Sequence, residues 1–429
     1  MNVILAIPLE IRLGTLFLLG TCIGSLVNLG VYRLAWHARA ISPWSAPPAD
    51  APLRRRRRDR VPILGWLGLR RESSLHGPGF WIRPMLVELF SGVGFAALYW
   101  WEIGRLGLIL PGVAPPSPAV LHAMYASHLV LISLMIVASL IDVDEKIIPD
   151  AITVSGTLFA LFVAAVCPWT LLPDMERVVN VGGLGDFFGA SPAPVAYDFL
   201  RLTSPNRWPD WIDGFPRAWP LLIGLSCWWL WCVALMDRRW RSQHGWVRAF
   251  GLFCARLRRE ASTWRILRMA LVGSAVVAAA WYMGGPRWAG LLSALVGMAA
   301  SGGIVWAIRI IGSAVLRREA MGFGDVTLMA MIGAFLGWQP CLIVFFLAPF
   351  AGLVIGLASL VLRRGPEIPY GPFLCLAALV VLVRWADLWQ WAAPVFGLGG
   401  ILVVVIFLCL VVMVPLLIVS RMIRTAFGH

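Results

Sequence analysis

Two aspartate motifs stand out in the sequence because each lies at the end of a long apolar run. The segment Met321-Gly322-Phe323-Gly324-Asp325 follows a basic turn and opens an apolar run, whereas Asp142 lies in the acidic segment 141–150 between two other apolar runs. A carboxylate beside a hydrocarbon layer is costly and is usually functional. Glycines beside such a carboxylate let the backbone and other groups approach it closely. We therefore expect Asp142 and Asp325 to meet at the membrane surface as a catalytic pair.

Such a pair has a defined chemistry. Two carboxylates held close together cannot both ionise cheaply, so they share one proton. The ionised member can act as a general base on a water molecule, and its protonated partner can polarise a peptide carbonyl and later protonate the amine. This chemistry requires no covalent intermediate, metal or cofactor. The sequence has no GxSxG motif, and its six histidines lack the spacing of metal ligands.

Each acidic residue also has a structural interpretation. A single aspartate at the end of a membrane helix is usually a cap or an interfacial charge, and GxGD alone is a weak signal. The combination of DxDxxxxxPD with GFGD on one predicted face favours catalysis. We interpret Asp144 mainly as a surface charge and Asp150 mainly as the N-cap of the next helix, with a direct role as the alternative. His128 is expected to be packed or hydrogen-bonded rather than a proton relay.

The composition predicts an all-α polytopic membrane protein. Of the 429 residues, 60% are hydrophobic and only 14% are charged, and apolar runs of about twenty residues recur. Many of the 23 tryptophans lie at the ends of these runs, as in interfacial aromatic belts. The formal charge of +14 is explained by cytoplasmic arginines, so we expect no nucleic-acid partner. The first run lacks a basic n-region and a cleavage site, which predicts a retained anchor.

The apolar runs predict about eleven spans, and eight to eleven fit the pattern. They cover 11–32, 84–101, 120–141, 150–169, 219–236, 267–281, 288–316, a short run to 338, 342–362, 372–385 and 398–419. The arginine-rich loops 33–83 and 237–268 should be cytoplasmic, and the more acidic loop 170–217 should lie outside. This places the N-terminus outside, and the C-terminus and both aspartate motifs on the cytoplasmic side.

Four regions follow from this reading. Residues 1–101 contain N-terminal spans and a basic loop without cysteine, and 102–169 contain the spans around Asp142. Residues 170–286 are interpreted as an inserted region with two spans, and 287–429 contain the GxGD motif and the C-terminal spans. An even number of inserted spans preserves the sidedness of Asp325.

The two aspartate motifs and several further segments resemble the prepilin peptidases, or type IV leader peptidases. The first motif extends over 141–150 and the second over 322–334. The supporting segments are Gly24-Ser25-Leu26-Val27-Asn28, Tyr32-Arg33-Leu34, Asp59-Arg60-Val61-Pro62, Val87-Glu88-Leu89 and Ile368-Pro369-Tyr370-Gly371-Pro372-Phe373. Together the matches extend over roughly half of the chain, and the paired aspartate motifs are the specific part.

The resemblance implies a GxGD-type aspartic peptidase of the bacterial inner membrane, which removes the leader from prepilins or type II secretion pseudopilins at the cytoplasmic face. In that family the scissile bond follows a glycine, between a short basic leader and a hydrophobic helix. By position, Asp142 and Asp325 would be the catalytic pair. Gly322, Gly324, Asp144 and Asp150 would support it. These enzymes often also N-methylate the new amino terminus with S-adenosylmethionine. Membrane lipids are further expected partners.

The sequence departs from the family pattern at two motifs. The family's cytoplasmic loop commonly binds zinc through two cysteine pairs, but 33–83 contains no cysteine and carries instead an arginine run and Ser73-Ser74-Leu75-His76. We therefore expect no zinc site, and methyl transfer is left open. Thr327 also stands where a lysine is usual after GxGD.

Two other functions are compatible with parts of the pattern. A presenilin-like intramembrane protease shares the chemistry but not the segments at 24–34 and 87–89. A transporter or a non-enzymatic secretion-system component would use its aspartates to bind protons or cations. A transporter favours acids near the bilayer midplane and paired repeats, whereas here both acids fall at span ends and no repeat is evident.

Overall fold

The computed structural model describes residues 5–37, 39, 41–44, 55–110, 113–178, 196–201, 212, 214–236, 260–317, 321–361 and 369–426. In these ranges eight helices are long and apolar enough to cross a membrane, and a bent helix pair could form a ninth span. The chain is therefore a polytopic helical membrane protein, as predicted. The exact number of spans and their orientation stay predictions.

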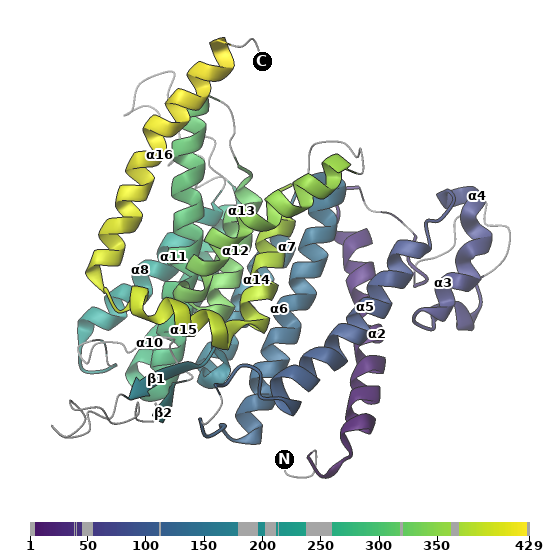
Figure 1. Cartoon of the computed structure of the whole chain (residues 1–429), viewed down its shortest axis with the longest axis horizontal. Coiled ribbons are helices and arrows are strands. Elements are labelled where there is room, and N and C mark those ends of the chain that lie inside the picture. Colours follow the sequence, from purple (N-terminus) through teal and green to yellow (C-terminus); the bar gives the residue numbers. More distant parts are fainter. Residues whose placement is uncertain are drawn as a thin grey trace, which may run out of the picture.

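The helices form a bundle, and the only sheet among the described residues is a small antiparallel pair of strands (Figure 1). The long apolar helices are α2 (Leu9–Leu34), α5 (Ile82–Tyr99, continued by η3, Trp100–Gly104), α6 (Pro118–Glu145), α8 (Ala218–Leu235), α10 (Ala261–Met283), α11 (Gly285–Leu316), α13 (Trp338–Val361) and α16 (Gly400–Ala426). The shorter ones are α3 (Leu64–Leu69), α4 (Ser73–His76), α7 (Asp150–Val166), α12 (Phe323–Leu336), α14 (Gly371–Val383) and α15 (Trp385–Phe396), with three-residue or four-residue turns η1 (Arg57–Arg60), η2 (Arg70–Glu72) and η4 (Pro168–Thr170). The strands are β1 (Asp174–Val178) and β2 (Ala196–Arg201).

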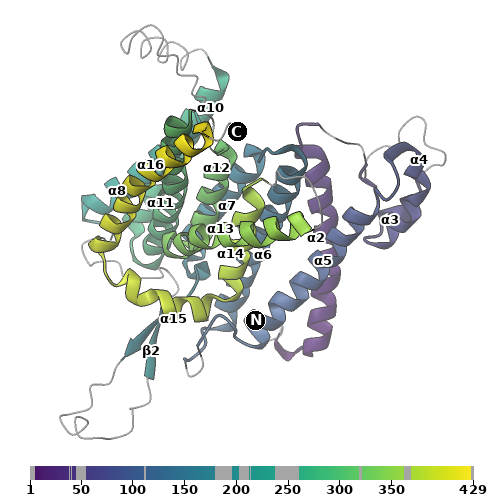
Figure 2. The same ribbon diagram turned by 45° about the horizontal axis from the view of Figure 1, so that its top comes forward.

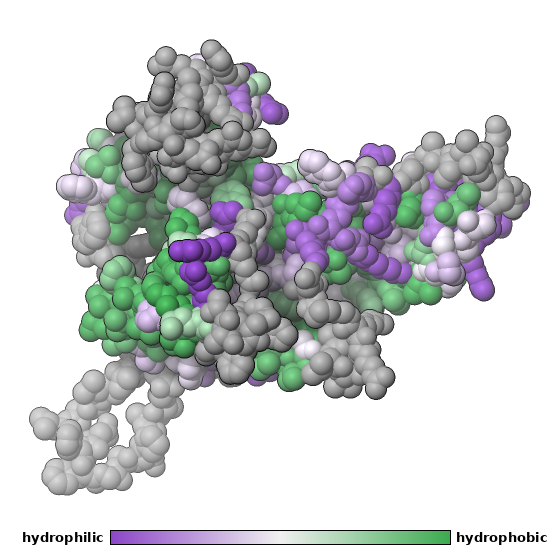
Figure 3. Space-filling view, turned by 90° about the horizontal axis from the view of Figure 1, so that it is seen from above, coloured by the Kyte–Doolittle hydropathy of each residue, from purple (hydrophilic) through white to green (hydrophobic). Residues whose placement is uncertain are grey.

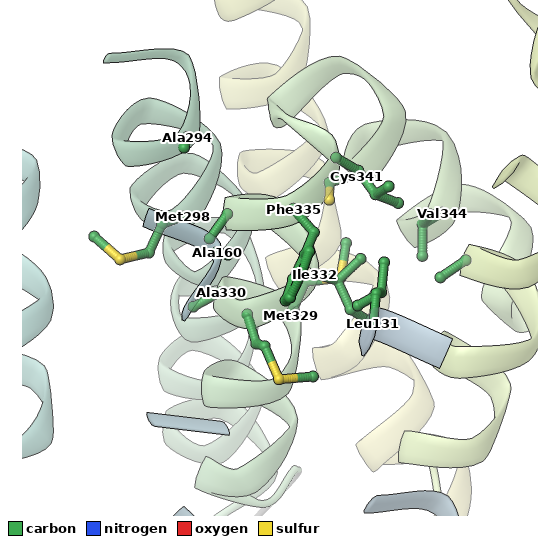
Figure 4. Close-up of a cluster of buried hydrophobic side chains, with 14 of the residues drawn as sticks. Leu131, Ala160, Ala294, Met298, Met329, Ala330, Ile332, Phe335, Cys341 and Val344 are labelled. Atoms are coloured by element: carbon green, nitrogen blue, oxygen red, sulfur yellow. The ribbon is translucent and has the colours of Figure 1, made fainter. Parts of the chain in front are cut away.

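Helix α12 forms the centre of the bundle. All of its residues from Asp325 to Leu336 are buried, as expected of a helix that is apolar all round. Its side chains pack with residues of α6, α7, α11 and α13 (Figure 4). With 14 residues it is about 21 Å long, shorter than a hydrocarbon layer of about 30 Å. The helix that begins with the GxGD motif is thus enclosed by protein.

Two glycines bring α11 and α12 into close contact. A Cβ atom on Gly297 would overlap the backbone carbonyl oxygen of Gly333, and a Cβ on Gly333 would overlap the carbonyl oxygen of Gly297. Small residues at a crossing let membrane helices approach closely and gain packing energy. This contact fixes the position of α12 against α11.

The predicted span at 372–385 corresponds to α14, which ends at Val383, and a second helix, α15, follows it directly. The chain bends by 95° between α14 and α15. The indole N–H of Trp101 donates to the carbonyl of Val383 (2.9 Å), and that of Trp385 donates to the carbonyl of Pro173 (2.6 Å). Both hydrogen bonds hold the region of the bend against distant parts of the chain. No local sequence pattern could predict them, because the paired residues are more than 200 positions apart.

The arginine-rich loop forms a small folded unit, residues 55–76, which we call the basic subdomain. Trp66 and Leu69 pack with Tyr32 of α2 in a separate apolar cluster. Figures 1 and 2 show α3 and α4 projecting sideways from the bundle, beyond the paired helices α2 and α5. In the view of Figure 3, hydrophilic side chains gather over this projection.

Candidate active site

A cavity of about 820 Å³ lies where five helix ends meet. Its described lining comes from the end of α2, the end of α6, the start of α7, the start of α12 and the residues that precede α14. Asp142 and Asp325 both line it. The structure therefore brings together the two carboxylates that the sequence predicts to pair, although 183 positions separate them in the chain numbering.

Asp142 lies in the last turn of α6 and is only 4% exposed. Its backbone carbonyl accepts a hydrogen bond from the N–H of Lys146 (2.8 Å), which closes the helix. The backbone N–H of Gly371, at the start of α14, donates a hydrogen bond to the Asp142 carboxylate. The Oδ2 atom of Asp142 is buried and has no hydrogen-bond partner among the described residues. This oxygen packs against the start of α14, where a Cβ atom on Gly371 would lie only 2.5 Å from it.

Asp325 lies in the first turn of α12 and is 8% exposed. Its carboxylate accepts a hydrogen bond from the backbone N–H of Gly322, the residue before the helix. A carboxylate three residues into a helix commonly caps it in this way and is stabilised by the positive end of the helix dipole. Asp325 and Asp142 are thus two buried carboxyl groups that line the same cavity.

The two glycines of the motif act differently. A Cβ on Gly324 would lie 2.9 Å from the Cβ of Ile148, so this glycine lets the start of α12 pack against the connection between α6 and α7. A Cβ on Gly322 would meet the Asp325 Oδ2 at 3.7 Å, an ordinary contact. Gly324 is therefore required by close packing, whereas Gly322 contributes through its backbone N–H.

The structure separates the roles of the two neighbouring acids. Asp144 forms an ion pair with Arg83 (2.6 Å) on the surface, as its interpretation as a surface charge predicts. Asp150 lines the cavity beside the catalytic candidates. Its prediction as an N-cap is wrong, because Pro149 occupies the cap position and Asp150 is the first helical residue, with no side-chain capping bond. The fixed φ of proline suits the cap position, so the helix begins one residue earlier than the sequence reading expected.

Sequence reasoning did not identify three further residues at the cavity. Gly371 holds Asp142, and its neighbour Tyr370 lines the cavity and interacts electrostatically with Asp325. The Glu145 carboxylate accepts hydrogen bonds from the backbone N–H groups of Trp36 (2.6 Å) and His37 (3.1 Å). These bonds join the end of α6 to the segment after α2 and form one wall of the cavity. Gly371 and Tyr370 lie in the segment 368–373, whose resemblance to the family could have pointed to them. No local pattern links Glu145 to the end of α2.

His128 forms a buried pair with Glu102 rather than part of the cavity. The side chains are 1% and 2% exposed, and Nδ1 of His128 lies 2.8 Å from Oε1 of Glu102. In α6, His128 precedes Asp142 by about 21 Å of helix. The prediction of a hydrogen-bonded histidine is confirmed.

Ion pairs occupy the loop in which the family commonly binds zinc. Arg55 donates two hydrogen bonds to the buried Glu72 (3.0 and 2.8 Å), and Arg71 pairs with the buried Asp59. Among the described residues, no group of three His, Cys, Asp or Glu side chains could hold a metal ion. Guanidinium groups do not ligate zinc, so the side chains present in this loop do not fit that metal.

The chain matches two family models. The model described as "Type IV leader peptidase family" matches residues 224–357, and that described as "Bacterial Peptidase A24 N-terminal domain" matches residues 18–102. The first match includes Asp325, and Asp142 lies between the two. The first match also begins inside 170–286, and the boundaries of the four predicted regions stay predictions.

Curated relatives are similar over part of the chain. A prepilin leader peptidase/N-methyltransferase of Aeromonas salmonicida is 33% identical over 100 residues, which is 23% of this chain and 33% of that protein. Those of Pseudomonas aeruginosa and Myxococcus xanthus are 36% identical over 86 residues (19% and 29% of the two chains) and 32% identical over 149 residues (35% and 39%). The chain thus matches about a third of the length of these relatives. No solved structure matches. Because both family models and these relatives match, the chain belongs to the type IV leader peptidase, or prepilin peptidase, family.

Proposed function

We propose that this protein is an aspartic endopeptidase that removes the leader peptide from type IV prepilins or type II secretion pseudopilins, with Asp142 and Asp325 as the catalytic pair. The observation that supports this most is the meeting of two buried carboxyl groups in one cavity at the end of the helix bundle. The relatives are prepilin leader peptidases, and we take the substrate class from them.

In this mechanism the pair carries a single proton in the resting state. The ionised carboxylate removes a proton from water, and the resulting oxygen nucleophile adds to the scissile carbonyl carbon while the protonated carboxyl hydrogen-bonds to the carbonyl oxygen. Collapse of the tetrahedral intermediate breaks the C–N bond as a proton passes to the departing amine. The cavity that both carboxyl groups line offers the space for the water and for the scissile carbonyl.

The location of the cavity favours cleavage near the membrane surface over cleavage inside a span. Its lining comes from helix ends and connections rather than from mid-helix positions. A leader peptide reaching from the cytoplasm could enter it while the following hydrophobic helix stays in the bilayer. We propose that this end faces the cytoplasm of a bacterial inner membrane, because the arginine-rich segments belong to this side in the predicted topology.

The basic subdomain and the cavity are distinct surfaces. Exposed arginines of the subdomain, including Arg58 and Arg60, lie with exposed Leu64 and Leu67 on the sideways projection. We propose that this surface contacts anionic lipid headgroups, each arginine contributing about 1 kcal/mol. Because the arginines would contact lipid and the cavity lining is rich in carboxylates, a basic leader would approach the cavity without meeting the arginines.

N-methylation of the new amino terminus, with S-adenosylmethionine as methyl donor, is a second proposed activity that rests on the names of the relatives. A second described cavity, of about 390 Å³ between α11, α13, α15 and α16, is lined by apolar side chains and does not fit a charged nucleoside. Mass analysis of the cleaved substrate after incubation with S-adenosylmethionine tests the activity: a gain of one methyl group on the new terminus supports it.

Cleavage of a prepilin-like precursor by the purified protein in lipid tests the main proposal. The comparison includes wild type, Asp142→Asn and Asp325→Asn, because asparagine keeps size and polarity but cannot exchange the proton. Asp387→Asn is the control, since Asp387 is an exposed carboxylate paired with Arg384 on α15. We expect wild type and the control to cut after the leader glycine and both site variants to be inactive although folded. Near-normal cleavage by either site variant would contradict the assignment.

A further inference from the structure

Tyr370 supplies the one hydroxyl group in the described lining of the cavity. The side chain is partly exposed, and its hydroxyl group is accessible and has no hydrogen-bond partner within the described ranges. A tyrosine hydroxyl that protein largely encloses usually finds a partner. Burial raises the pKa of Tyr370 to about 12, so the phenol keeps its proton at neutral pH. It is therefore a hydrogen-bond donor for which the fold itself has no use.

The fold fixes Tyr370 close to Asp325. A Cβ atom on Gly371, the next residue in the chain, would lie 2.9 Å from the side chain of Ile148, and a Cβ on Gly324 would lie 2.9 Å from the same residue. Ile148 is thus packed between the start of α14 and the start of α12. Because Asp325 follows Gly324 directly, the two side chains line the cavity from neighbouring helix starts.

The backbone around Tyr370 is held without the hydroxyl group. The N–H of Gly371 donates to the Asp142 carboxylate, and the carbonyl of Tyr370 accepts the N–H groups of Phe373 (3.0 Å) and Leu374 (3.3 Å) at the start of α14. The ring of Tyr370 meets that of Phe373 edge-on, with 6.5 Å between the ring centroids. Removal of the hydroxyl group alone therefore leaves these contacts in place.

The cavity has few groups that could stabilise negative charge on a substrate oxygen. Its described lining carries four carboxylates, and its lysine, Lys146, is already engaged in an interaction. In the proposed mechanism the protonated carboxyl group gives the carbonyl oxygen one hydrogen bond. A further donor placed where charge develops stabilises the transition state more than the ground state. The indole of Trp36 is the other neutral side-chain donor of this lining, but Trp36 is 81% exposed.

We propose that the Tyr370 hydroxyl donates a hydrogen bond to the scissile carbonyl oxygen as this oxygen gains negative charge, beside the shared proton of Asp142 and Asp325. This inference rests on the proposed function and makes Tyr370 a third catalytic residue. The phenol keeps its proton throughout, so proton transfer stays with the two carboxyl groups.

The test measures kcat and KM for cleavage of a prepilin-like precursor by wild type, Tyr370→Phe and the control Tyr282→Phe, all full length and in lipid. Tyr282 lies on α10 and is 70% exposed, so the control loses the same atom away from the cavity. Loss of one donor to a developing oxyanion costs a factor of about 100 or more in rate, so we expect Tyr370→Phe to lower kcat by about that factor with KM unchanged. The control should equal wild type.

Two further measurements distinguish catalysis from a structural role. The thermal midpoint of Tyr370→Phe should match that of wild type, because the ring and the backbone contacts are retained. The pH dependence of kcat should keep its shape, because both carboxyl groups are retained.

The outcomes separate this inference from the function on which it rests. If wild type cuts the precursor and Tyr370→Phe keeps its kcat, or changes KM alone, the inference is wrong. If kcat falls together with the thermal midpoint, or with a shifted pH profile, the hydroxyl group acts through the fold or through the carboxyl pair, and the inference is also wrong. If wild type cuts no precursor, the proposed function fails and this inference fails with it.

Discussion

The backbone N–H of Gly371 holds the carboxylate of Asp142, and a Cβ atom at Gly371 would lie only 2.5 Å from the Oδ2 of that carboxylate. Glycine at this position therefore lets the start of α14 approach the end of α6 closely enough for its backbone to orient a proposed catalytic group.

Gly371→Ala should inactivate the protein without unfolding it. The added methyl group would displace the Asp142 carboxylate and would also meet Ile148 at 2.9 Å. Since misplacement of a reacting group by about 1 Å can cost a factor of about 100 in rate, we expect kcat for leader cleavage to fall by about that factor. A cleavage assay beside a thermal melt in detergent measures both effects.

Gly94→Ala provides the control for this substitution. Gly94 lies within α5, and a Cβ there would have nothing within 4 Å. This variant should cleave normally. Equal activity of the Gly371 and Gly94 variants would show that the close approach of Gly371 is not needed for cleavage.

Gly297→Ala should lower both stability and activity. The new methyl group would overlap the carbonyl oxygen of Gly333 and push α12 away from α11. Overpacking of this kind typically costs about 1–3 kcal/mol, and a displaced α12 moves Asp325. We expect a thermal midpoint several degrees lower and a fall in cleavage of about tenfold.

The matched control lies on the same helix. Gly303 is part of α11, and a Cβ there would have open space. Gly303→Ala should be neutral or slightly stabilising, because alanine favours a helix over glycine by up to about 1 kcal/mol. If both variants melt alike, the Gly297–Gly333 contact does not determine the packing of α12.

The sequence was sufficient for the features that depend on local pattern. Apolar runs located the long helices, and the two acidic motifs located Asp142 and Asp325, because an intramembrane carboxylate is costly wherever it occurs. The sequence did not predict the 95° bend after α14 or the hydrogen bond from the backbone of Gly371 to Asp142. Both features depend on contacts between segments that are distant in the chain. The cap at Asp150 was placed one residue late, because Pro149 competes for the same position.

The same limit applies to the basic subdomain. The sequence explained its arginines by orientation in the membrane, but the structure shows Arg55 buried against Glu72 and Arg71 paired with Asp59. Pattern alone cannot tell a surface arginine from a buried one, because the difference lies in which carboxylates the fold brings beside it.

Glu88→Gln should loosen the basic subdomain from α2 and α5. The buried Glu88 carboxylate accepts hydrogen bonds from Ser25 (2.7 Å), Trp66 (2.9 Å) and the backbone N–H of Ile63 (2.5 Å). The amide group of glutamine would turn a donor toward one of these donors, at a cost of about 1–3 kcal/mol. We expect faster proteolysis within 55–83, measured by mass spectrometry of the fragments.

Glu10→Gln is the control for the loss of a carboxylate, because Glu10 is exposed in the first turn of α2. Its rate of proteolysis should equal that of wild type. If Glu88→Gln is cut no faster than the control, the subdomain is anchored by its apolar cluster rather than by Glu88.

Acid should release the basic subdomain through Asp59. The hydrogen bonds from Arg71 hold the pKa of this buried carboxyl below its ordinary value of 3.8, and the backbone N–H of Arg56 lowers it further. A carboxyl group whose pKa is lower in the folded state stabilises that state above its unfolded pKa, and this stabilisation is lost as the pH falls through the folded value. Protection factors for amide hydrogen exchange of residues 55–76, which correct for the intrinsic pH dependence of exchange, should therefore be high and independent of Asp59 ionisation above about pH 5, and should fall below the ordinary pKa. In Asp59→Asn the exchange should already be fast at neutral pH, with no further acceleration from this group in acid. If wild type and Asp59→Asn show the same dependence on pH, the transition belongs to another carboxyl group, and the Asp59–Arg71 pair does not stabilise the subdomain.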